Sequence, residues 1–436
     1  MKRYSEYKDS GVKWIGEIPG HWECTRIKFI ANLYGRIGFR GYNSKDLNKD
    51  GIGAITLSPS NMKDMMMDYT NVTYLSWEKY NESPEIMIQQ GDILFVKTGS
   101  SYGKSCYVDN LPQEATINPQ ILRINPLING RFLCYYFNSS LARTFTECGV
   151  VGGTIPTISQ EKVGNFIALN PPLPEQEAIV TYLDSKVAKI DEYISIAEKK
   201  IAALEELKQT IITEAVTRGI HKDVPMKDSG VKWIGMIPEH WEIRRLKNIV
   251  LCNSDTLSEN FPKEEVIKYV EISDVNYTSG IINVQNISFG EAPSRARRIT
   301  KKNDVIVSTV RTYLKAVAKI QEDGLIVSTG FAVLHPIIGN SSFLSYFVLS
   351  ESFINNVIAD SKGISYPAIS TSDLVCIAMP LPPLSEQQEI VTYLDSKVTN
   401  INQLCQAERS QIEKLKEYKQ RLISDVVTGK VKVTND

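Results

Sequence analysis

The sequence predicts an α+β protein made of two tandem copies of one folding unit, each a mixed α/β domain followed by one long helix. Two observations lead to this fold class. Segments of the first half recur in the same order in the second half, and an internal repeat of this kind decides the architecture of a chain. In addition, each copy ends in a helical pattern of roughly 44 residues, far longer than one small domain can cover.

The recurring segments form a frame that both copies share. Lys8–Glu23 reads KDSGVKWIGEIPGHWE and Lys227–Glu242 reads KDSGVKWIGMIPEHWE, with two differences. Later, Pro171–Val187 (PPLPEQEAIVTYLDSKV) recurs as Pro382–Val398 (PPLSEQQEIVTYLDSKV). A looser third match relates LKQTIITEAVTRG to YKQRLISDVVTGK near the end of the chain. Between these segments the copies diverge, so each unit combines the shared frame with a middle of its own.

The divergent middles are predicted to be twisted sheet domains. β-rich runs such as Asp92–Val96 and Asp304–Val307 alternate with turns rich in Gly, Asn and Pro. The predicted division is a first domain at 1–173, a first long helix at 174–218, a linker and second domain at 219–384, and a second long helix at 385–429.

Both long helices have marked ends. Pro174 suits the first turn of the first helix, and Ser385 with Gln388 three residues later predicts a capping box for the second. Gly219 and Gly429 lie where a left-handed C-terminal cap is wanted.

Along each helix the apolar positions advance by three and four residues, in one common register. Helices this long need a partner, and an antiparallel coiled coil between the two repeats is the simplest arrangement. Pairing of each helix with another chain is the alternative. The residues predicted to form the coiled-coil spacer are Ile190, Ile194, Ile201, Leu204, Ile211, Ile401, Cys405, Ile412, Leu415 and Leu422.

Composition limits the class of protein. The 436 residues are 42% hydrophobic and 23% charged, as in an ordinary globular protein with two to three domains. The polar start and the absence of a long apolar run predict a cytoplasmic protein without a membrane span. Seven cysteines without C-x-x-C spacing and only four histidines favour reduced thiols over a disulfide framework or a zinc site. No Gly-rich cofactor loop follows a predicted strand, so no bound cofactor is expected. The net charge of −1 means that any nucleic-acid binding surface must be locally basic.

Three motifs come close to catalytic signatures and fail. Thr98–Ser105 resembles a phosphate loop but has three residues between its glycines, where that loop needs four. Asn170–Leu173 resembles the Asn-Pro-Pro-aromatic motif of adenine methyltransferases, but a leucine replaces the aromatic residue. His21 and His240 both lie in Ile-Pro-x-His-Trp, and two lone equivalent histidines without an expected carboxylate or thiol partner are interpreted as structural.

Cationic side chains interleaved with hydroxyls and aromatics lie in both middles. Such residues neutralise phosphates and read base edges, which makes them candidates for DNA binding, although a charge run is more often a solvated surface. Thr98, Tyr102 and Lys104 are expected to correspond to Thr309, Tyr313 and Lys315. The full candidate set is Arg36, Arg40, Lys97, Thr98, Ser100, Tyr102, Lys104, Arg295, Arg297, Arg298, Thr309, Arg311, Tyr313 and Lys315, with Lys301 and Lys302 beside it.

The repeated motifs Asp-Ser-Gly-Val-Lys-Trp-Ile-Gly-x-Ile-Pro-x-His-Trp and Pro-Pro-Leu-x-Glu-Gln, with the long helices after them, resemble the specificity subunit of type I restriction-modification enzymes. The resemblance covers nearly the whole chain. It implies that each divergent middle is a target recognition domain and that the helices space the two domains. It also implies that two methyltransferase subunits dock on the frame, that restriction subunits with motor and nuclease activity join for cleavage, and that these partners bind ATP, magnesium and S-adenosylmethionine.

The expected function is the recognition of a bipartite, asymmetric site on double-stranded DNA, directing adenine methylation or cleavage without catalysing either. Inserting four residues near Leu204 and near Leu415 together should then lengthen the unread gap. A self-contained nuclease or methyltransferase is one alternative, and purified chain alone would then cleave or methylate DNA. The other alternative is a protein scaffold that binds no DNA. Gel shifts with the methyltransferase present would distinguish it from a DNA-recognition subunit.

Overall fold

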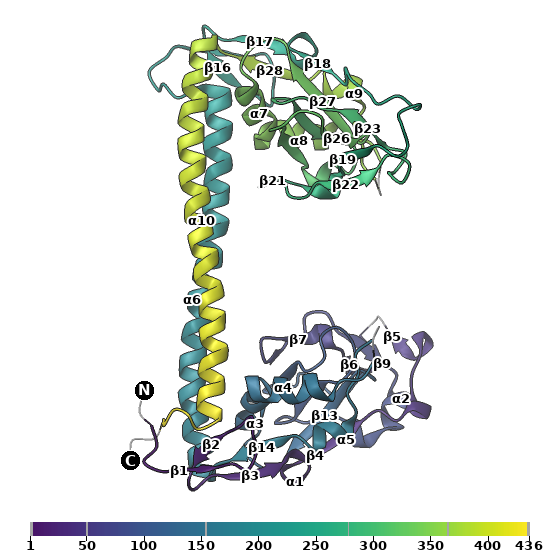
Figure 1. Ribbon diagram of the computed structural model, residues 1–436, viewed down its shortest axis with the longest axis vertical. Helices are drawn as coiled ribbons and strands as arrows, with labels where there is room; N and C mark the ends of the chain where they lie inside the picture. Colours follow the sequence, from purple (N-terminus) through teal and green to yellow (C-terminus); the bar gives the residue numbers. More distant parts are fainter. Residues whose placement is uncertain (1–2, 49–50, 153–154, 278, 364–365, 434–436) are drawn as a thin grey trace. The chain divides into compact units, whose positions relative to one another are not determined.

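The computed structural model describes residues 3–48, 51–152, 155–277, 279–363 and 366–433 (Figure 1). The chain divides into two compact units. Unit 1 comprises Met1–Ala197 together with Ser410–Asp436, and unit 2 comprises Glu198–Arg409. Each long helix therefore contributes one part to each unit, whereas the sequence-based division treats each helix as a separate segment.

Unit 1 contains two four-stranded sheets. In the first sheet the order is β11-β10-β13-β4, and all its strand pairs are antiparallel. In the second the order is β12-β6-β9-β5, and β12 and β6 are parallel. The strands are β4 Ala31–Gly35, β5 Leu47–Asn48, β6 Ala54–Leu57, β9 Thr73–Leu75, β10 Ile93–Val96, β11 Ser105–Tyr107, β12 Ala115–Ile117 and β13 Ile121–Pro126.

Shorter elements complete unit 1. Its strand pairs outside the two sheets are β1 Tyr7–Asp9 with β2 Glu17–Pro19, β3 Glu23–Arg26 with β14 Ile167–Asn170, and β7 Met62–Lys63 with β8 Met66–Met67. Its helices outside the long pair are α1 Ile27–Ile30, α2 Trp77–Asn81, α3 Gly130–Phe137, α4 Ser140–Gly149 and α5 Gln160–Gly164, and its 3₁₀ turns are η1 Gly38–Arg40, η2 Ser44–Asp46, η3 Pro59–Asn61 and η4 Pro84–Ile86.

Unit 2 repeats this plan with one rearranged sheet. The sheet β18-β27-β24-β25 corresponds to the first sheet of unit 1, whereas the second has the order β22-β19-β26-β23 and carries an additional edge strand, β23. The strands are β18 Val250–Cys252, β19 Val266–Val270, β22 Gln285–Ser288, β23 Ala296–Ile299, β24 Val305–Ser308, β25 Val317–Lys319, β26 Ile326–Ser328 and β27 Phe331–Pro336.

Apart from the 3₁₀ turn between β24 and β25, the remaining elements of unit 2 also have counterparts in unit 1. The strand pairs are β15 Met226–Asp228 with β16 Met236–Pro238, β17 Glu242–Arg245 with β28 Ala378–Leu381, and β20 Val275–Asn276 with β21 Gly280–Ile281. The helices are α7 Ser341–Leu349, α8 Glu351–Asp360 and α9 Thr371–Leu374, and the 3₁₀ turns are η5 Leu246–Asn248, η6 Ile272–Asp274 and η7 Thr312–Leu314.

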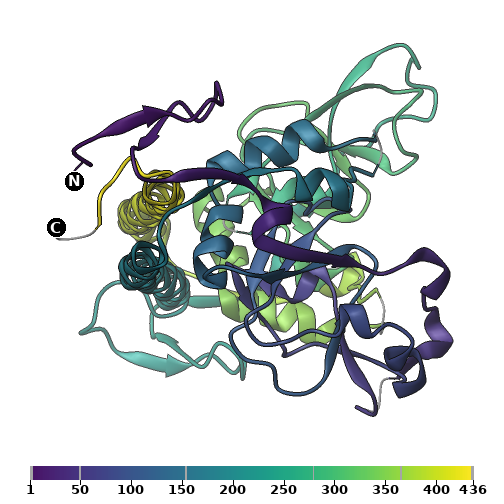
Figure 2. The same cartoon turned by 90° about the horizontal axis from the view of Figure 1, so that it is seen from below.

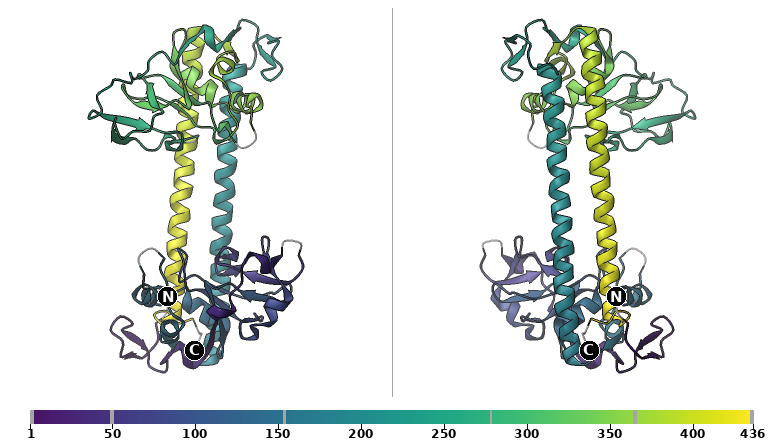
Figure 3. Two further views of the ribbon diagram at one scale, coloured as in Figure 1. Left: turned by 90° about the vertical axis from the view of Figure 1, so that its right-hand side faces the viewer. Right: turned by 90° about the vertical axis from the view of Figure 1, so that its left-hand side faces the viewer.

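The two long helices, α6 (Leu173–Arg218) and α10 (Leu384–Val427), lie side by side in all views (Figures 1, 2 and 3). Within unit 2 the Lys200 ammonium meets the Glu408 carboxylate at 2.5 Å and the Lys208 ammonium donates to Asn402 at 3.1 Å, so the pairing is antiparallel. In unit 1, Lys419 bonds Asp191.

The predicted spacer residues lie along this helix pair. Cys405 and Leu422 are each 2% exposed, and Ile190, Ile401 and Ile412 are also buried. The other five are half-buried: Ile194, Ile201, Leu204, Ile211 and Leu415.

The helix ends agree with the sequence in part. Gly219, directly after the end of α6, and Gly429, two residues after the end of α10, adopt left-handed backbone conformations with φ of 77° and 72°, as predicted. The predicted capping box is wrong, because α10 begins at Leu384 and Ser385 therefore lies inside its first turn. Gln388 accepts a hydrogen bond from the side-chain amide of Asn340 instead.

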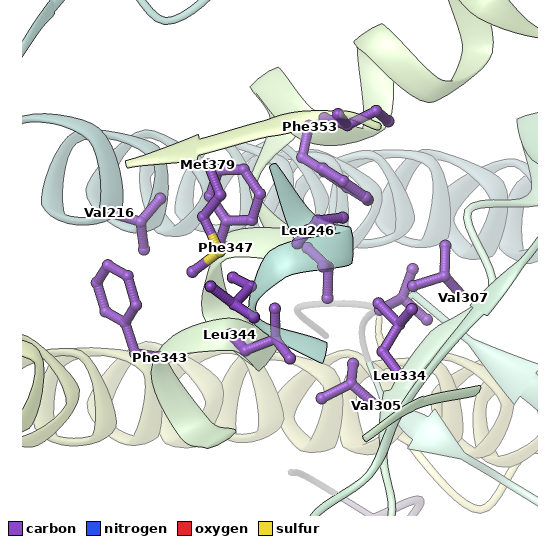
Figure 4. Packing of buried hydrophobic residues seen from close by; sticks show 14 of the residues in the cluster. Val216, Leu246, Val305, Val307, Leu334, Phe343, Leu344, Phe347, Phe353 and Met379 are labelled. Carbon is purple, nitrogen blue, oxygen red and sulfur yellow. The ribbon is translucent and has the colours of Figure 1, made fainter. Parts of the chain in front are cut away.

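Each unit has its own hydrophobic core. In unit 2, Phe343 and Phe347 of α7 pack with Val216 of α6 and with Leu394 of α10 in one cluster (Figure 4). In unit 1, fully buried Trp22 packs with residues from both long helices. Within the described residues, no helix is both long and apolar enough to cross a membrane.

Candidate nucleic-acid interface

The shared frame is held by a glutamate at the start of each long helix. Glu175 of α6 accepts hydrogen bonds from the Tyr4 hydroxyl at 2.5 Å, the Trp22 indole N–H at 2.9 Å and His21 Nε2 at 2.8 Å. Burial raises the pKa of Tyr4, and its bond to the Glu175 carboxylate raises it further, so the tyrosine remains a donor. The opening motif is thereby fixed to the first turn of the long helix.

Unit 2 has the same arrangement with one donor fewer. Glu386 of α10 accepts from the Trp241 indole N–H at 3.0 Å and from His240 Nε2 at 2.7 Å. The structural role expected for the histidines is consistent with these contacts, but the premise that they lack a carboxylate partner is wrong. Their partners come from more than 140 residues further along the chain.

The glutamine after each of these glutamates fixes the long helix to the sheet domain. Gln176 Oε1 accepts from the Asn129 backbone N–H at 3.1 Å, while its Nε2 donates to the Pro171 carbonyl at 2.8 Å. Gln387 makes the same two contacts with Asn340 and Pro382. Because Gln176 and Gln387 are almost fully buried, each amide is held on both sides and the helix has a defined direction relative to its domain.

About two turns further along each helix, an aspartate repeats the pattern. Asp184 accepts from the Tyr135 hydroxyl at 2.6 Å, and Asp395 accepts from the Tyr346 hydroxyl at 2.6 Å. The hydrogen-bonding side chains of the Pro-Pro-Leu-x-Glu-Gln motif and of the following Tyr-Leu-Asp-Ser-Lys-Val segment thus join the long helices to their units. The sequence repeat indicated that these segments matter, but not which residues they contact.

The glycines at the helix ends close the frame. A Cβ on Gly429 would lie 2.5 Å from Cδ of Pro19, and a Cβ on Gly219 would lie 3.2 Å from Cζ2 of Trp241. The C-terminal end of α10 therefore packs on the first opening motif and that of α6 on the second, with no space for a side chain at Gly429 and little at Gly219.

The predicted DNA-binding residues of unit 1 fall into two groups. The first is the loop between β10 and β11, where Ser100 is exposed and Tyr102 and Lys104 are partly exposed. These three residues line an open pocket of about 410 Å³ that also includes Arg143, a residue that the sequence did not single out. Lys97 and Thr98 are half-buried at the base of this loop, and burial lowers the pKa of Lys97.

Arg36 and Arg40 form the second group, and Arg36 is only 7% exposed. Its guanidinium donates to the carbonyl of Ile117 at 3.1 Å and to Thr116 Oγ1 at 3.1 Å, both on β12. In unit 2 the strand equivalent to β12 is β26, which is paired with the additional strand β23. Arg36 thus satisfies part of the β12 backbone and is poorly placed to contact DNA directly, while Arg40 is partly exposed and pairs with Glu85.

In unit 2 the predicted cations differ in how far their charge is already neutralised. Arg295 pairs with Glu271, and Lys301 pairs with Asp255 at 2.8 Å, which raises the Lys301 pKa. Arg297 lies over the Phe289 ring at 4.7 Å, and Arg298 has a buried Nε without a hydrogen-bond partner. Lys302 is exposed.

The loop between β24 and β25 carries the other candidates. Thr309 is nearly buried and its hydroxyl donates to the Gly330 carbonyl, whereas Arg311 and Tyr313 are exposed and Lys315 is partly exposed. Arg311 and Lys315 have left-handed backbone conformations, with φ of 51° and 52°. For a residue with a side chain, this conformation costs roughly 1–2 kcal/mol.

The structure corrects the expected correspondence between the two loops by one residue. The Lys97 backbone N–H donates to the Gln120 carbonyl and its own carbonyl accepts from Ile158, just as Thr309 does with Gly330 and Ile369. Lys97 therefore corresponds to Thr309, and the two left-handed residues Arg311 and Lys315 correspond to Gly99 and Gly103. The expected match of Thr98, Tyr102 and Lys104 with Thr309, Tyr313 and Lys315 is wrong because similar residue types were aligned without the strand register.

The two near-motifs have ordinary structural roles. Thr98–Ser105 leads from strand β10 into strand β11, whereas a phosphate loop leads into a helix. Asn170 ends β14, and its side-chain oxygen accepts from Gln176 in the first turn of α6. Within the described residues, no group of three or more His, Cys, Asp or Glu side chains is arranged to hold a metal ion.

A duplicated frame that joins paired long helices to two α/β domains with different loops defines a class of two-domain recognition proteins. The chain belongs to the family described as the type I restriction modification DNA specificity domain, whose model matches residues 21–206 and 238–414. It is 25% identical to the type I restriction enzyme MjaVIII specificity subunit of Methanocaldococcus jannaschii, over 98% of both chains. It is 22% identical to the EcoBI specificity subunit of Escherichia coli, over 91% of this chain and 85% of that one.

The fold is also found in a solved structure, described as the structural basis of complex assembly and conformational transition of the type I R-M system. That chain has a TM-score of 0.69 and 17% sequence identity, with 95% of this chain and 99% of that chain covered. The predicted family and fold class are confirmed: two tandem α/β domains combined with a pair of long antiparallel helices.

Proposed function

We propose that this protein is the DNA sequence-recognition subunit of a type I restriction-modification complex, and that each unit reads one half of a bipartite, asymmetric DNA site. The observation that carries the proposal is that equivalent Glu, Gln and Asp contacts occur in both units, while the loops that follow β10 and β24 differ in charge and backbone. Equal frames suit two copies of one partner, and unequal loops suit two different half-sites.

The same proposal assigns catalysis to the partners. Methyltransferase subunits would methylate an adenine in each half-site, restriction subunits would cleave, and this chain would choose the site. In support, one of the two segments closest to catalytic motifs connects two strands, and the other leads from the end of β14 into α6. The chain would then bind DNA without binding ATP or S-adenosylmethionine itself.

The frame also offers equivalent apolar surfaces for two identical partners. Leu173 and Leu384 occupy the same position of the repeated motif and are 55% and 64% exposed. Leu207 and Tyr418, also equivalent, are 49% and 46% exposed on the outer surface of their helices. Repeated exposed apolar residues are typical of a surface that binds the same partner twice.

Methylome sequencing of cells with and without the gene tests the function most directly. The expected result is one bipartite adenine-methylated motif that disappears with the gene. Gel shifts with the chain and its methyltransferase partner, using duplexes with and without that motif, should show specific binding that depends on this chain. A complex that forms without any preference for the motif would favour the scaffold alternative instead.

Helix length is proposed to set the unread gap between the half-sites. The structure changes where an insertion should be made: the pairs Lys200–Glu408 and Lys208–Asn402 flank Leu204, so its counterpart lies near Cys405 rather than near Leu415. Seven residues inserted at both places keep the helical register and add about 10 Å, or roughly three base pairs of DNA. A methylated motif with an unchanged gap would contradict the spacer role.

A further inference from the structure

In the loop between β24 and β25, two cationic residues have left-handed backbone conformations. The equivalent positions of the unit 1 loop are glycines. The η7 turn, Thr312–Leu314, is preceded by Arg311 and followed by Lys315, both left-handed. Gly99 and Gly103 at the equivalent positions have φ of 103° and 82°, so the backbone of this loop favours glycine at both places. Retaining long cationic side chains there requires a reason other than folding.

Each of these cations lies over a tyrosine ring from another part of unit 2. Arg311 Cζ is 5.1 Å from the centre of the Tyr366 ring, and Lys315 Nζ is 5.5 Å from the centre of the Tyr277 ring. Such cation–π contacts orient a charge without neutralising it. Tyr366 lies near this loop because Ala368, two residues later, forms an isolated antiparallel β-bridge with Val310.

The charges of Arg311 and Lys315 remain available. Within the part of unit 2 that the structure describes, neither side chain forms an ion pair, in contrast to Arg295 with Glu271 and Lys301 with Asp255. Tyr313, between them, is 52% exposed, and Tyr366 is 65% exposed. Two unneutralised cations beside two exposed aromatic rings form a surface suited to nucleic acid, where guanidinium groups bond base edges and ammonium groups bind phosphates.

We infer that Arg311 and Lys315 make the principal base and phosphate contacts of unit 2, and that Tyr366 and Tyr277 are positioning residues that hold these two cations toward the DNA. The inference rests on the proposed function and deepens it. It adds two aromatic residues that lie outside the basic segments. It also predicts that the two half-sites are read by different chemistry, because unit 1 has glycines where unit 2 has cations.

The decisive experiment measures DNA affinity of the full chain with its methyltransferase partner, using duplexes with single substitutions in either half-site. Arg311→Ala and Tyr366→Ala should each weaken binding about tenfold and relax base preference in one half-site only. The double variant should be little worse than either single variant, because Tyr366 acts through Arg311. Tyr366→Phe keeps the ring and should bind like the unaltered protein.

The salt dependence of DNA affinity tests the roles of Lys315 and Tyr277. Lys315→Ala should reduce the slope of log affinity against log salt by about one, with little change in base preference. Tyr277→Leu should act in the same direction, provided that circular dichroism shows a folded protein, since the Tyr277 hydroxyl also bonds the Leu349 carbonyl.

Failure of the positioning role and failure of the proposed DNA-recognition function give different results in these experiments. If Tyr366→Ala binds as tightly and as selectively as the unaltered protein, or if its effect adds fully to that of Arg311→Ala, the positioning role is wrong while DNA recognition stands. If the unaltered complex shows no preference for the methylated motif, the proposed function itself fails, and the inference with it.

Discussion

Unit 1 and unit 2 each bury an aspartate at the same turn, but the side chain that pairs with it differs between the two units. Asp92 and Asp304 are equivalent buried carboxylates, and each accepts from a backbone N–H three residues earlier. In unit 1 the Arg123 guanidinium pairs with Asp92 at 2.6 Å, whereas in unit 2 the His335 ring meets Asp304 at 2.7 Å. The comparison shows that the fold requires a buried acceptor at this turn. The residue that pairs with this acceptor is free to vary.

The largest expected effect is the loss of stability when the partner of the buried aspartate is removed, and it should differ between the two units. Arg123→Met leaves the Asp92 carboxylate, 0% exposed, without its cation, and should lower the free energy of unfolding by about 3–5 kcal/mol. His335→Ala should cost only about 1–2 kcal/mol, because the His335 side chain is 37% exposed and water can reach Asp304 in its place. Hydrogen exchange followed by mass spectrometry would report each unit separately.

A control for that prediction removes both charges. Asp92→Asn combined with Arg123→Met should recover part of the stability lost by Arg123→Met alone, because no unpaired charge remains buried. Equal losses from Arg123→Met and His335→Ala would show that the two turns are energetically alike, despite their different partners.

The second prediction concerns the glutamates of the frame. Glu175→Ala leaves the Trp22 indole and the Tyr4 hydroxyl without their acceptor, and should cost about 2–4 kcal/mol. Glu386→Ala leaves one donor fewer without its acceptor and should cost about 1–2 kcal/mol. Urea denaturation monitored by tryptophan fluorescence would measure both, and Glu175→Gln, which keeps an acceptor, should be milder. A larger loss from Glu386→Ala would reverse the comparison.

The glycines at the helix ends give the third test. Gly429→Ala places a Cβ 2.5 Å from Pro19 in a left-handed conformation, and should destabilise unit 1 by about 2–3 kcal/mol. Gly219→Ala meets Trp241 at 3.2 Å and should cost about 1–2 kcal/mol, mainly from its backbone conformation. Thermal unfolding would rank the two variants, and Gly38→Ala, with open space around its Cβ and no positive φ, is the control.

The smallest effect has the opposite sign. Arg311→Gly gives unit 2 the residue that unit 1 has at this position, and should leave stability unchanged or raise it by up to about 1 kcal/mol. Gly99→Arg, the reciprocal change, should lower stability by about 1–2 kcal/mol. Denaturation midpoints of the two variants would decide this, and a marked loss of stability in Arg311→Gly would mean that the Arg311 side chain serves the fold.

The sequence predicted the parts of the structure that depend on local pattern. The repeat, the two long helices and the left-handed glycines at their ends follow from identities and spacings along the chain. The partners of His21 and Trp22 did not, because Glu175 lies about 150 residues away and nothing local indicates which carboxylate will meet them.

The candidate site was predicted less well for two physical reasons. Basic character does not reveal burial, so Arg36, which bonds the β12 backbone, looked the same as the exposed Arg311. Strand register is set by hydrogen bonds between distant segments, so Gly99 could not be matched to Arg311 by residue type alone. The unequal lengths of the two middles would have signalled that a shift of register was possible.

The return of Ser410–Asp436 to unit 1 has a consequence for how the protein is made. Unit 2 is continuous in the chain, so it can fold as soon as Arg409 has been synthesised. The apolar surface around Trp22 and Leu183 must wait for Leu422 and Val426, which cover it. At about 5–20 residues per second, synthesis of Glu198–Arg409 takes roughly 10–40 s. During that time the first half of the nascent chain is exposed to aggregation and to chaperones, and a chain lacking its last helix would never bury that surface.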